Sequence, residues 1–158
     1  MAFVLSENAK LYYSTSAYEA EPANPATYWI EVCNVKDVSL TLEKDEIDVT
    51  TRCSGGFKEF ADGLVDANIT FQMLYNTNDT AFTAIQNAFF TKGSLEFAVM
   101  DGVLPPEAGD TAAGLRAECM VKSFSRSESL GEVLMTDVAL RPVSNDSSSP
   151  EWYTKTTA

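Results

Sequence analysis

The stretch that decides the fold runs from Lys36 to Tyr75, and its two ends read KDVSLTL (36–42) and NITFQMLY (68–75). Both ends alternate apolar and polar residues with a period of two. This alternation is typical of a β-strand with one buried face, because successive side chains of a strand point to opposite faces of the sheet. The stretch therefore predicts two half-buried strands. The side chains expected inside are Val38, Leu40, Leu42, Ile69, Phe71 and Met73.

Between these strands the sequence predicts a long loop over residues 43–67. The loop begins with four carboxylates within six residues and later carries the pair Gly55-Gly56. A loop of this length is uncommon in a compact domain and usually has a function of its own. We expect it to contact another subunit. The residues expected to make that contact are Glu43, Asp45, Glu46, Asp48, Thr50, Thr51, Arg52, Phe57 and Phe60.

The remaining patterns predict more strands and one helix. Further strands are expected at 10–14, 28–33, 94–100, 115–124 and 133–140, with Trp29 in the core. The fold class predicted from this order is mainly β, an antiparallel β-sandwich or barrel with one flanking α-helix and long inter-subunit loops.

The helix is expected at about residues 79–92. Asn78 or Asp79 can cap its start, and Gly93 supplies its end. Its apolar stripe, which we expect to pack on the sheet, consists of Phe82, Ile85 and Phe89.

The length of 158 residues fits one domain. We expect this domain to cover residues 1–143, with an N-terminal arm at 1–9. Residues 144–158 are expected to form a flexible C-terminal tail, because the run from Ser144 to Pro150 is rich in serine. Trp152 and Tyr153 lie beyond this run, where they can dock on another surface.

The composition excludes several kinds of chemistry. The chain has 23 acidic and 11 basic residues and a formal charge of −12, and such a surface repels the phosphates of nucleic acid. It has no histidine, which excludes a Ser-His-Asp triad and a zinc site with a histidine ligand. The acidic run 43–48 lacks the glycine and the terminal glutamate of a calcium-binding EF-hand loop. We expect no enzymatic activity, no cofactor and no metal.

The three cysteines, Cys33, Cys53 and Cys119, have no C-x-x-C spacing, which favours reduced thiols in a cytosolic product. The N-terminal residues lack the basic start and the apolar core of a signal peptide. No apolar run is long enough to span a membrane. We therefore expect a protein that is made and folded in the cytoplasm and has no membrane partner.

Several segments within 35–70 resemble the major tail tube proteins of long-tailed, siphovirus-type bacteriophages. These segments are Val35-Lys36-Asp37-Val38, the acidic run 45–51, Ser54-Gly55-Gly56-Phe57-Lys58-Glu59-Phe60, Asp62-Gly63-Leu64 and Asp66-Ala67-Asn68-Ile69-Thr70. The resemblance covers about residues 3–142, with the Trp29 strand before this region and the single helix after it. The chain from Asn145 onward departs from the family pattern.

This resemblance implies a structural virion protein that forms hexameric rings, which stack into the tail tube through which DNA is ejected into the host. The implied partners are other copies of the chain, a tail tip or initiator protein, a tail terminator, a tape measure protein and genomic DNA in the lumen without specific binding. Assembly is expected in the host bacterial cytoplasm. Related inner tubes of contractile tails or secretion systems remain an alternative. Another is a stand-alone β-sandwich module that binds or decorates a virion, for which an exposed aromatic patch is needed.

The expected lumen surface is the polar face of the two central strands. The residues proposed to line it are Ser39, Thr41, Asn68, Thr70 and Gln72, with acidic side chains near the strand ends. Carboxylates in this place repel passing phosphates, although at physiological salt this repulsion acts only over about 8 Å.

Overall fold

All strand pairings among the described residues are antiparallel. The structure is a computed structural model that describes residues 9–16, 18–19, 21–104, 106–144 and 149–156. The elements in chain order are β1 (Lys10–Ser14), α1 (Pro25–Tyr28), β2 (Ile30–Glu31), β3 (Val35–Asp48), β4 (Phe60–Leu74), α2 (Thr80–Thr91), β5 (Ser94–Met100), β6 (Thr111–Ser127), β7 (Met135–Val143) and β8 (Glu151–Thr156). The predicted mainly β, antiparallel fold with a flanking helix is confirmed.

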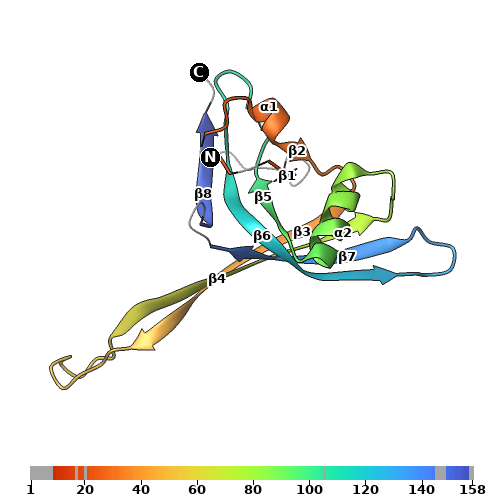
Figure 1. The fold of residues 1–158 in the computed structure, drawn as a ribbon. Helices are drawn as coiled ribbons and strands as arrows, with labels where there is room; N and C mark the ends of the chain where they lie inside the picture. Colours follow the sequence, from red (N-terminus) through yellow and green to blue (C-terminus); the bar gives the residue numbers. More distant parts are fainter. Residues whose placement is uncertain (1–8, 17, 20, 105, 145–148, 157–158) are drawn as a thin grey trace.

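The long strand β6 joins two wings of one sheet. The strand order is β2-β1-β5-β6-β7-β4-β3, and β8 also pairs with β6. The first part of β6 lies between β5 and β8, whereas its last part, from Glu118 to Ser127, pairs with β7. The first wing therefore consists of β2, β1, β5, β8 and the start of β6, and the second wing of the end of β6, β7, β4 and β3. Figure 1 shows the two wings meeting at a steep angle.

The main hydrophobic core lies where both wings and α2 meet. It joins side chains of β1, β5 and β6 to Ile69, Phe71 and Met73 of β4 and to Phe82 and Ile85 of α2. A second cluster covers the other face of the first wing, and its members are Tyr12, Tyr28, Trp29, Ala98, Met100, Leu104, Ala112 and Tyr153. The first wing is thus covered on both faces. The expectation that Trp29 lies in the core is confirmed.

The predicted helix is present as α2. The N–H of Ala81 donates a hydrogen bond of 3.1 Å to the Asp79 carboxylate, so Asp79 is the N-cap. At the other end, Lys92 takes the left-handed conformation with φ of 58°, and Gly93 donates its N–H to the carbonyl of Ala88. Phe82 and Ile85 are buried, and the partly buried Phe89 stacks on Phe124 of β6. The helix therefore packs its apolar stripe on the sheet, as expected.

The expectation of a loop over residues 43–67 is wrong. Strands β3 and β4 pair from Val35 opposite Met73 to Asp48 opposite Phe60, so that only residues 49–59 form the turn. We call residues 43–67 the arm, which projects away from both wings in Figure 1. The side chains of 43–48 are exposed on both faces of the arm. No core touches this ribbon to require alternating apolar residues, so its sequence lacks the pattern that marks a half-buried strand.

Two bulges shape the long hairpin. The register shifts between Lys36 and Ser39, where Asp37 has a φ of 56°, and shifts back between Lys44 and Glu46. Gly63 lies opposite the second shift, and a Cβ atom on it would stand 2.8 Å from the Cβ of Asp45. Only glycine fits there without movement of the backbone. Bulges bend a strand and increase its twist, so these positions set the direction of the arm.

Two other expectations need correction. Val38 and Leu42 are exposed, since β3 is the edge strand and extends past the core. In place of a strand at 28–33, residues 25–28 form the short helix α1, which Pro25 starts, and β2 covers only Ile30–Glu31. The strands at 10–14 and 94–100 are confirmed, and those at 115–124 and 133–140 are present as the longer β6 and the shifted β7.

The expectation of a flexible C-terminal tail is wrong for residues 151–156. Residues Glu151–Thr156 form β8, which pairs with Thr111–Arg116 of β6. The aromatic pair Trp152-Tyr153 favours a strand, and Tyr153 is buried. The serine-rich composition of the preceding residues concealed this strand. Residues 145–148, like residues 1–8 of the expected N-terminal arm, lie outside the described residues.

Candidate assembly surface

The residues expected to contact another subunit all lie on the arm. Glu43, Asp45, Glu46 and Asp48 belong to β3, and Phe60 opens β4. The others, Thr50, Thr51, Arg52 and Phe57, lie in residues 49–59, which we call the tip. The structure therefore brings all nine residues together on one projecting element.

Hydrogen bonds within the tip hold its shape. The N–H of Thr50 donates to the Asp48 carboxylate at 2.9 Å, and the N–H of Glu59 donates to the Thr50 hydroxyl at 2.8 Å. Hydrogen bonds from the hydroxyl and the N–H of Thr50 lower the pKa of Asp48. Gly55 and Gly56 both have positive φ, which lets the chain turn at the end of the tip. The tip is thus an ordered surface.

The arm exposes large apolar side chains. Phe57 is 79% exposed and Leu64 83% exposed, and Ile47 and Phe60 are also exposed. Single exposed apolar residues are normal, whereas a group of them on one element marks an interaction site.

Acidic residues oppose one another along the two paired strands of the arm, residues 43–48 and 60–67, which we call its stem. Glu43 pairs with Asp66, and Glu46 pairs with Asp62. Like charges opposite each other destabilise a strand pair. Lys44 relieves part of this repulsion through an exposed ion pair of 3.8 Å with Asp62.

The five residues expected to line a lumen share one face of the second wing. Ser39 pairs with Thr70, Thr41 pairs with Asn68, and Gln72 pairs with Lys36. Paired residues of neighbouring strands point to the same side of a sheet, whereas Ile69, Phe71 and Met73 point into the core. We call this side of β3, β4, β7 and β6 the polar face.

The polar face continues onto β7 and β6. Gln72 pairs with Asp137, which pairs with Ser125, and Thr70 pairs with Ala139, which pairs with Ser123. Arg141 of β7 is held by Asp66 at 2.8 Å, so its charge is already compensated. The face is therefore covered mainly by hydroxyl and amide groups, and it also carries the charged side chains of Lys36, Glu43 and Asp137. Ser123, Ser125 and Asp137 were not among the residues predicted from the sequence. The alternation of apolar and polar residues in 135–143 was enough to place Asp137 on the polar face.

An apolar groove lies where the arm meets the two wings, which together we call the body. It encloses about 580 Å³ between the stem of the arm, β7 and the start of β8. Its apolar walls are formed by Leu42, Val65, Ala67, Leu115, Pro142 and Trp152, and its charged members are Asp66, Arg141 and Glu151. Trp152 is 63% exposed and Val65 62% exposed. We call this site the Trp152 groove. Sequence reasoning gave Trp152 as a docking aromatic but did not pair it with the arm.

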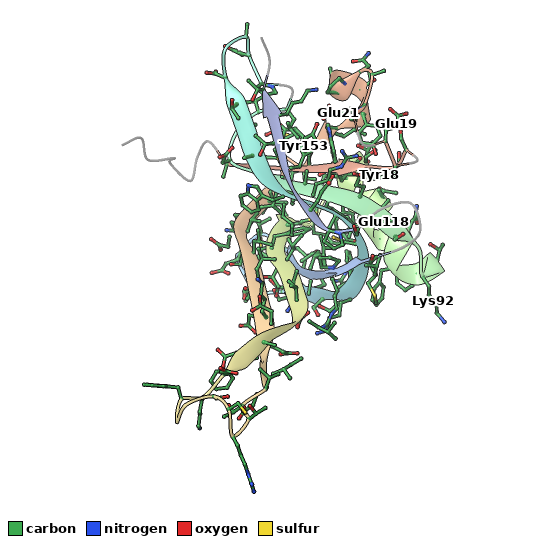
Figure 2. All side chains as sticks on the ribbon, turned by 90° about the vertical axis from the view of Figure 1, so that its left-hand side faces the viewer. Tyr18, Glu19, Glu21, Lys92, Glu118 and Tyr153 are labelled. Carbon is green, nitrogen blue, oxygen red and sulfur yellow. The ribbon has the colours of Figure 1, made fainter. Side chains whose placement is uncertain are left out.

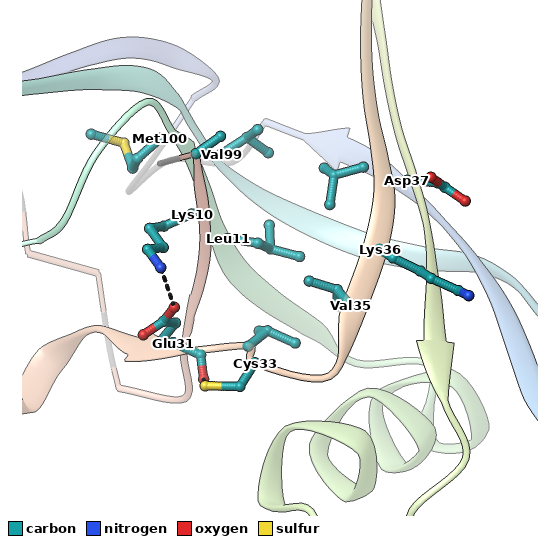
Figure 3. A pocket seen from close by; sticks show the side chains of 12 residues that line it. Lys10, Leu11, Glu31, Cys33, Val35, Lys36, Asp37, Val99 and Met100 are labelled. Carbon is teal, nitrogen blue, oxygen red and sulfur yellow. Dashed lines mark hydrogen bonds and ion pairs between the residues drawn. The ribbon is translucent and has the colours of Figure 1, made fainter. Parts of the chain in front are cut away.

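A second pocket, of about 600 Å³, opens between β1, β2 and the root of β3. Figure 3 shows Lys10 joined to Glu31 at its rim, at 3.3 Å, with Leu11, Val35 and Val99 along its walls and Cys33 at its edge. Lys36 and Asp37 also line it, and the Cys33 thiol faces the Glu31 carbonyl at 4.0 Å, so that this nucleophile contacts no general base. The pocket therefore offers room without recognisable chemistry.

A buried arginine anchors β8 to the body. The Arg116 guanidinium forms an ion pair with Glu96 and donates to the carbonyl of Glu19, and the Tyr28 hydroxyl donates to the same Glu96 carboxylate. Burial alone would lower the pKa of Arg116, but the Glu96 carboxylate raises it overall. The rings of Tyr18, Trp29 and Tyr153 lie 4.7, 5.0 and 5.1 Å from the guanidinium carbon. Figure 2 shows Tyr18, Glu19 and Tyr153 on the same side of the molecule. This cluster fixes β8, and through it Trp152.

In the part of the chain that the structure describes, no three Asp, Glu or Cys residues are grouped to hold a metal ion. Among the same residues, neither helix is long and apolar enough to cross a bilayer.

The chain resembles solved structures in fold alone. A scan against models of protein families and a search of curated proteins gave no match. A chain of the SPP1 tail tube matches with a TM-score of 0.70 and 9% identity over 97% of this chain and 80% of that chain. A chain in the tail of an empty gene transfer agent particle, refined with C6 symmetry, matches with 0.65 and 15% identity over 94% and 98%. A chain of the sheath–tube complex of an extracellular contractile injection system matches with 0.62 and 9% identity over 98% and 92%.

Proposed function

We propose that this chain is a tail tube protein, a structural subunit that assembles into rings that stack into a hollow tube. The observation that carries the proposal is the match to the SPP1 tail tube chain over 97% of this chain, which includes both wings and the arm. No catalytic constellation competes with this assignment among the described residues, because the chain has no histidine and the two pockets described above lack a reactive pair.

The ring forms through the exposed edge of β3. Within the described residues, β3 has a strand partner on one side only. A neighbouring subunit that pairs with this edge continues the second wing, and a closed ring of such pairs leaves no free edge. The C6 symmetry of the gene transfer agent tail supports six subunits in a ring.

The polar face lines the lumen, with Ser39, Thr41, Asn68, Thr70 and Gln72 at its centre. Hydroxyl and amide groups prevail on this face, and Arg141 is compensated by Asp66. Lys36, which pairs with Gln72, also lies on this side, where the carboxylates of Glu43 and Asp137 outnumber it. Phosphate binding depends on lysine and arginine side chains, so this surface lets DNA pass without adhesion.

The arm contacts the next ring. Contact between unlike surfaces that does not close produces an open filament, so one arm per subunit is enough to stack rings. The nine arm residues named from the sequence, with Leu64, provide this contact. The other partners are a tail tip or initiator protein, a terminator, a tape measure protein and genomic DNA in the lumen. The tube belongs to a virion tail that is assembled in the host bacterial cytoplasm.

The second candidate is the inner tube of a contractile injection system. The match to the sheath–tube complex, with a TM-score of 0.62, favours it. The two candidates differ in the outer surface, because an inner tube must also bind a sheath. Particles purified with a sheath layer around the tube would support this alternative.

The proposal is tested by negative-stain electron microscopy of the purified protein over a concentration series, together with its solution mass. We expect rings or hollow tubes of uniform width. If the protein remains monomeric, a tail tip complex is added as an initiator. A folded monomer that still forms no ring or tube would reject the proposal and favour a stand-alone binding module.

A further inference from the structure

We infer that the tip of one subunit docks into the Trp152 groove of a second copy in the adjacent ring. The inference rests on the proposed function and names the surface that receives the arm. Both surfaces expose large apolar side chains on an isolated chain: Phe57 on the tip, and Trp152 and Val65 in the groove. Burial of such side chains between two copies removes from water the apolar surface that the monomer exposes.

The charges of the two surfaces are opposite. The tip has Arg52 and Lys58 against Glu59, which gives it one net positive charge in a chain of net charge −12. The groove has Asp66 and Glu151 against Arg141, which gives it one net negative charge. Opposite charges at the rim of an apolar contact favour the correct register and speed association.

The groove cannot receive the tip of its own chain. Leu42 lies in the groove and Val49 begins the tip, and seven residues of paired strand hold these positions about 23 Å apart. The tip is also ordered by its own hydrogen bonds before it binds. A rigid tip that points away from its own groove can be received only by the groove of a second copy. Because each subunit has one tip and one groove, each chain is linked to one neighbour above and one below.

The test uses the natural cysteine of the tip. Cys53 is exposed, whereas Cys119 is buried. In a Cys33→Ser background, Trp152→Cys or Glu151→Cys places a second exposed thiol at the groove, and assembled tubes are treated with a short bismaleimide. The Glu151→Cys variant keeps the tryptophan. Leu130→Cys in the same background is the matched control, because Leu130 is fully exposed in the turn between β6 and β7.

We expect a ladder of covalent dimers, trimers and higher oligomers from the groove variants on a denaturing gel. The ladder should disappear when Cys53→Ser is added and should be absent with Leu130→Cys. Tubes that form normally but give no ladder with either groove variant, or an equal ladder with Leu130→Cys, would overturn the inference and leave the proposed function intact. A parent chain that forms no tube, even with an initiator, rejects the proposed function and the docking with it.

Discussion

At the scale of single residues, the most demanding site is the buried pair of Arg116 and Glu96. Arg116 is 1% exposed and Glu96 5% exposed, so both charges have left water. Such a pair gains stability only when other groups satisfy its remaining donors and acceptors, as the Glu19 carbonyl and the Tyr28 hydroxyl do here. The pair sits beneath β8, and its integrity therefore decides whether the C-terminal strand stays on the body.

Loss of Arg116 should destabilise the chain strongly. We expect Arg116→Met to lower the free energy of unfolding by about 3–5 kcal/mol, because the Glu96 carboxylate remains buried without its cation. The measurement is urea denaturation of the monomer. The double variant Arg116→Met with Glu96→Gln should recover part of the loss, and an unchanged urea midpoint in the single variant would contradict the role of the pair.

The three cysteines should differ in reactivity. Burial raises the pKa of the Cys119 thiol to about 12, whereas Cys33 and Cys53 are exposed. The thiolate is the reactive form, so Cys119 stays protonated and inert at pH 8. Mass spectrometry after maleimide labelling should find two labels on the native chain and three in urea. A third label on the native chain would show that the core around β6 opens.

At the scale of elements, the sequence was informative wherever one face of an element is buried. The strand containing Ile69, Phe71 and Met73 and the helix with Phe82 and Ile85 were predicted because the core imposes a pattern on their residues. The arm was missed because water surrounds both of its faces, and no periodicity distinguishes an exposed strand from a loop. The polar face was found in part, since Ser39 and Thr70 alternate with core residues. The Trp152 groove was not found, because it unites residues of β3, β4, β6, β7 and β8 that only the fold brings together.

Removal of the tip should separate folding from assembly. Asp48 and Phe60 are paired partners, so replacing residues 49–59 by Asn-Gly closes the hairpin with a two-residue turn. We expect a monomer whose unfolding free energy changes by less than about 1 kcal/mol, because the tip lies outside the core. Electron microscopy should show no stacked tubes. The matched control is Thr83→Ala on the exposed side of α2, and tubes of normal length from the tip deletion would contradict the role of the arm.

At the scale of the whole molecule, the charge distribution matters more than the total charge. The chain carries a net charge of −12, yet hydroxyl and amide groups cover most of the polar face. Of the cations on this face, Arg141 is paired with Asp66, and Lys36 lies beside Gln72 near the start of β3. A surface that must not hold DNA needs chiefly the absence of unpaired cations, because phosphate affinity grows with each lysine or arginine that meets a phosphate. Part of the acidic excess lies at the end of this face, where Glu43 pairs with Asp66 on the arm.

Lysine on the polar face should make the tube retain DNA. Tubes of a Thr41→Lys, Thr70→Lys variant, assembled with DNA and then treated with nuclease, should keep protected DNA at low salt and lose it as salt rises. The parent and a variant with Thr83→Lys and Asn87→Lys, the same added charge on exposed positions of α2, should protect none. Equal protection by the α2 variant would mean that the polar face does not line the lumen.

The bulge at Gly63 also has a mechanical consequence. The arm is a ribbon of two strands, and such ribbons twist more readily than broad sheets. Because the bulge interrupts its ladder between Lys44 and Glu46, we expect the ribbon to twist most easily at this place. In the tube proposed above, arms of this kind would take up a bending load as torsion, so that each ring would keep its bore. We expect such a tube to curve and recover its shape, with a persistence length that increases when Gly63 and its bulge are removed.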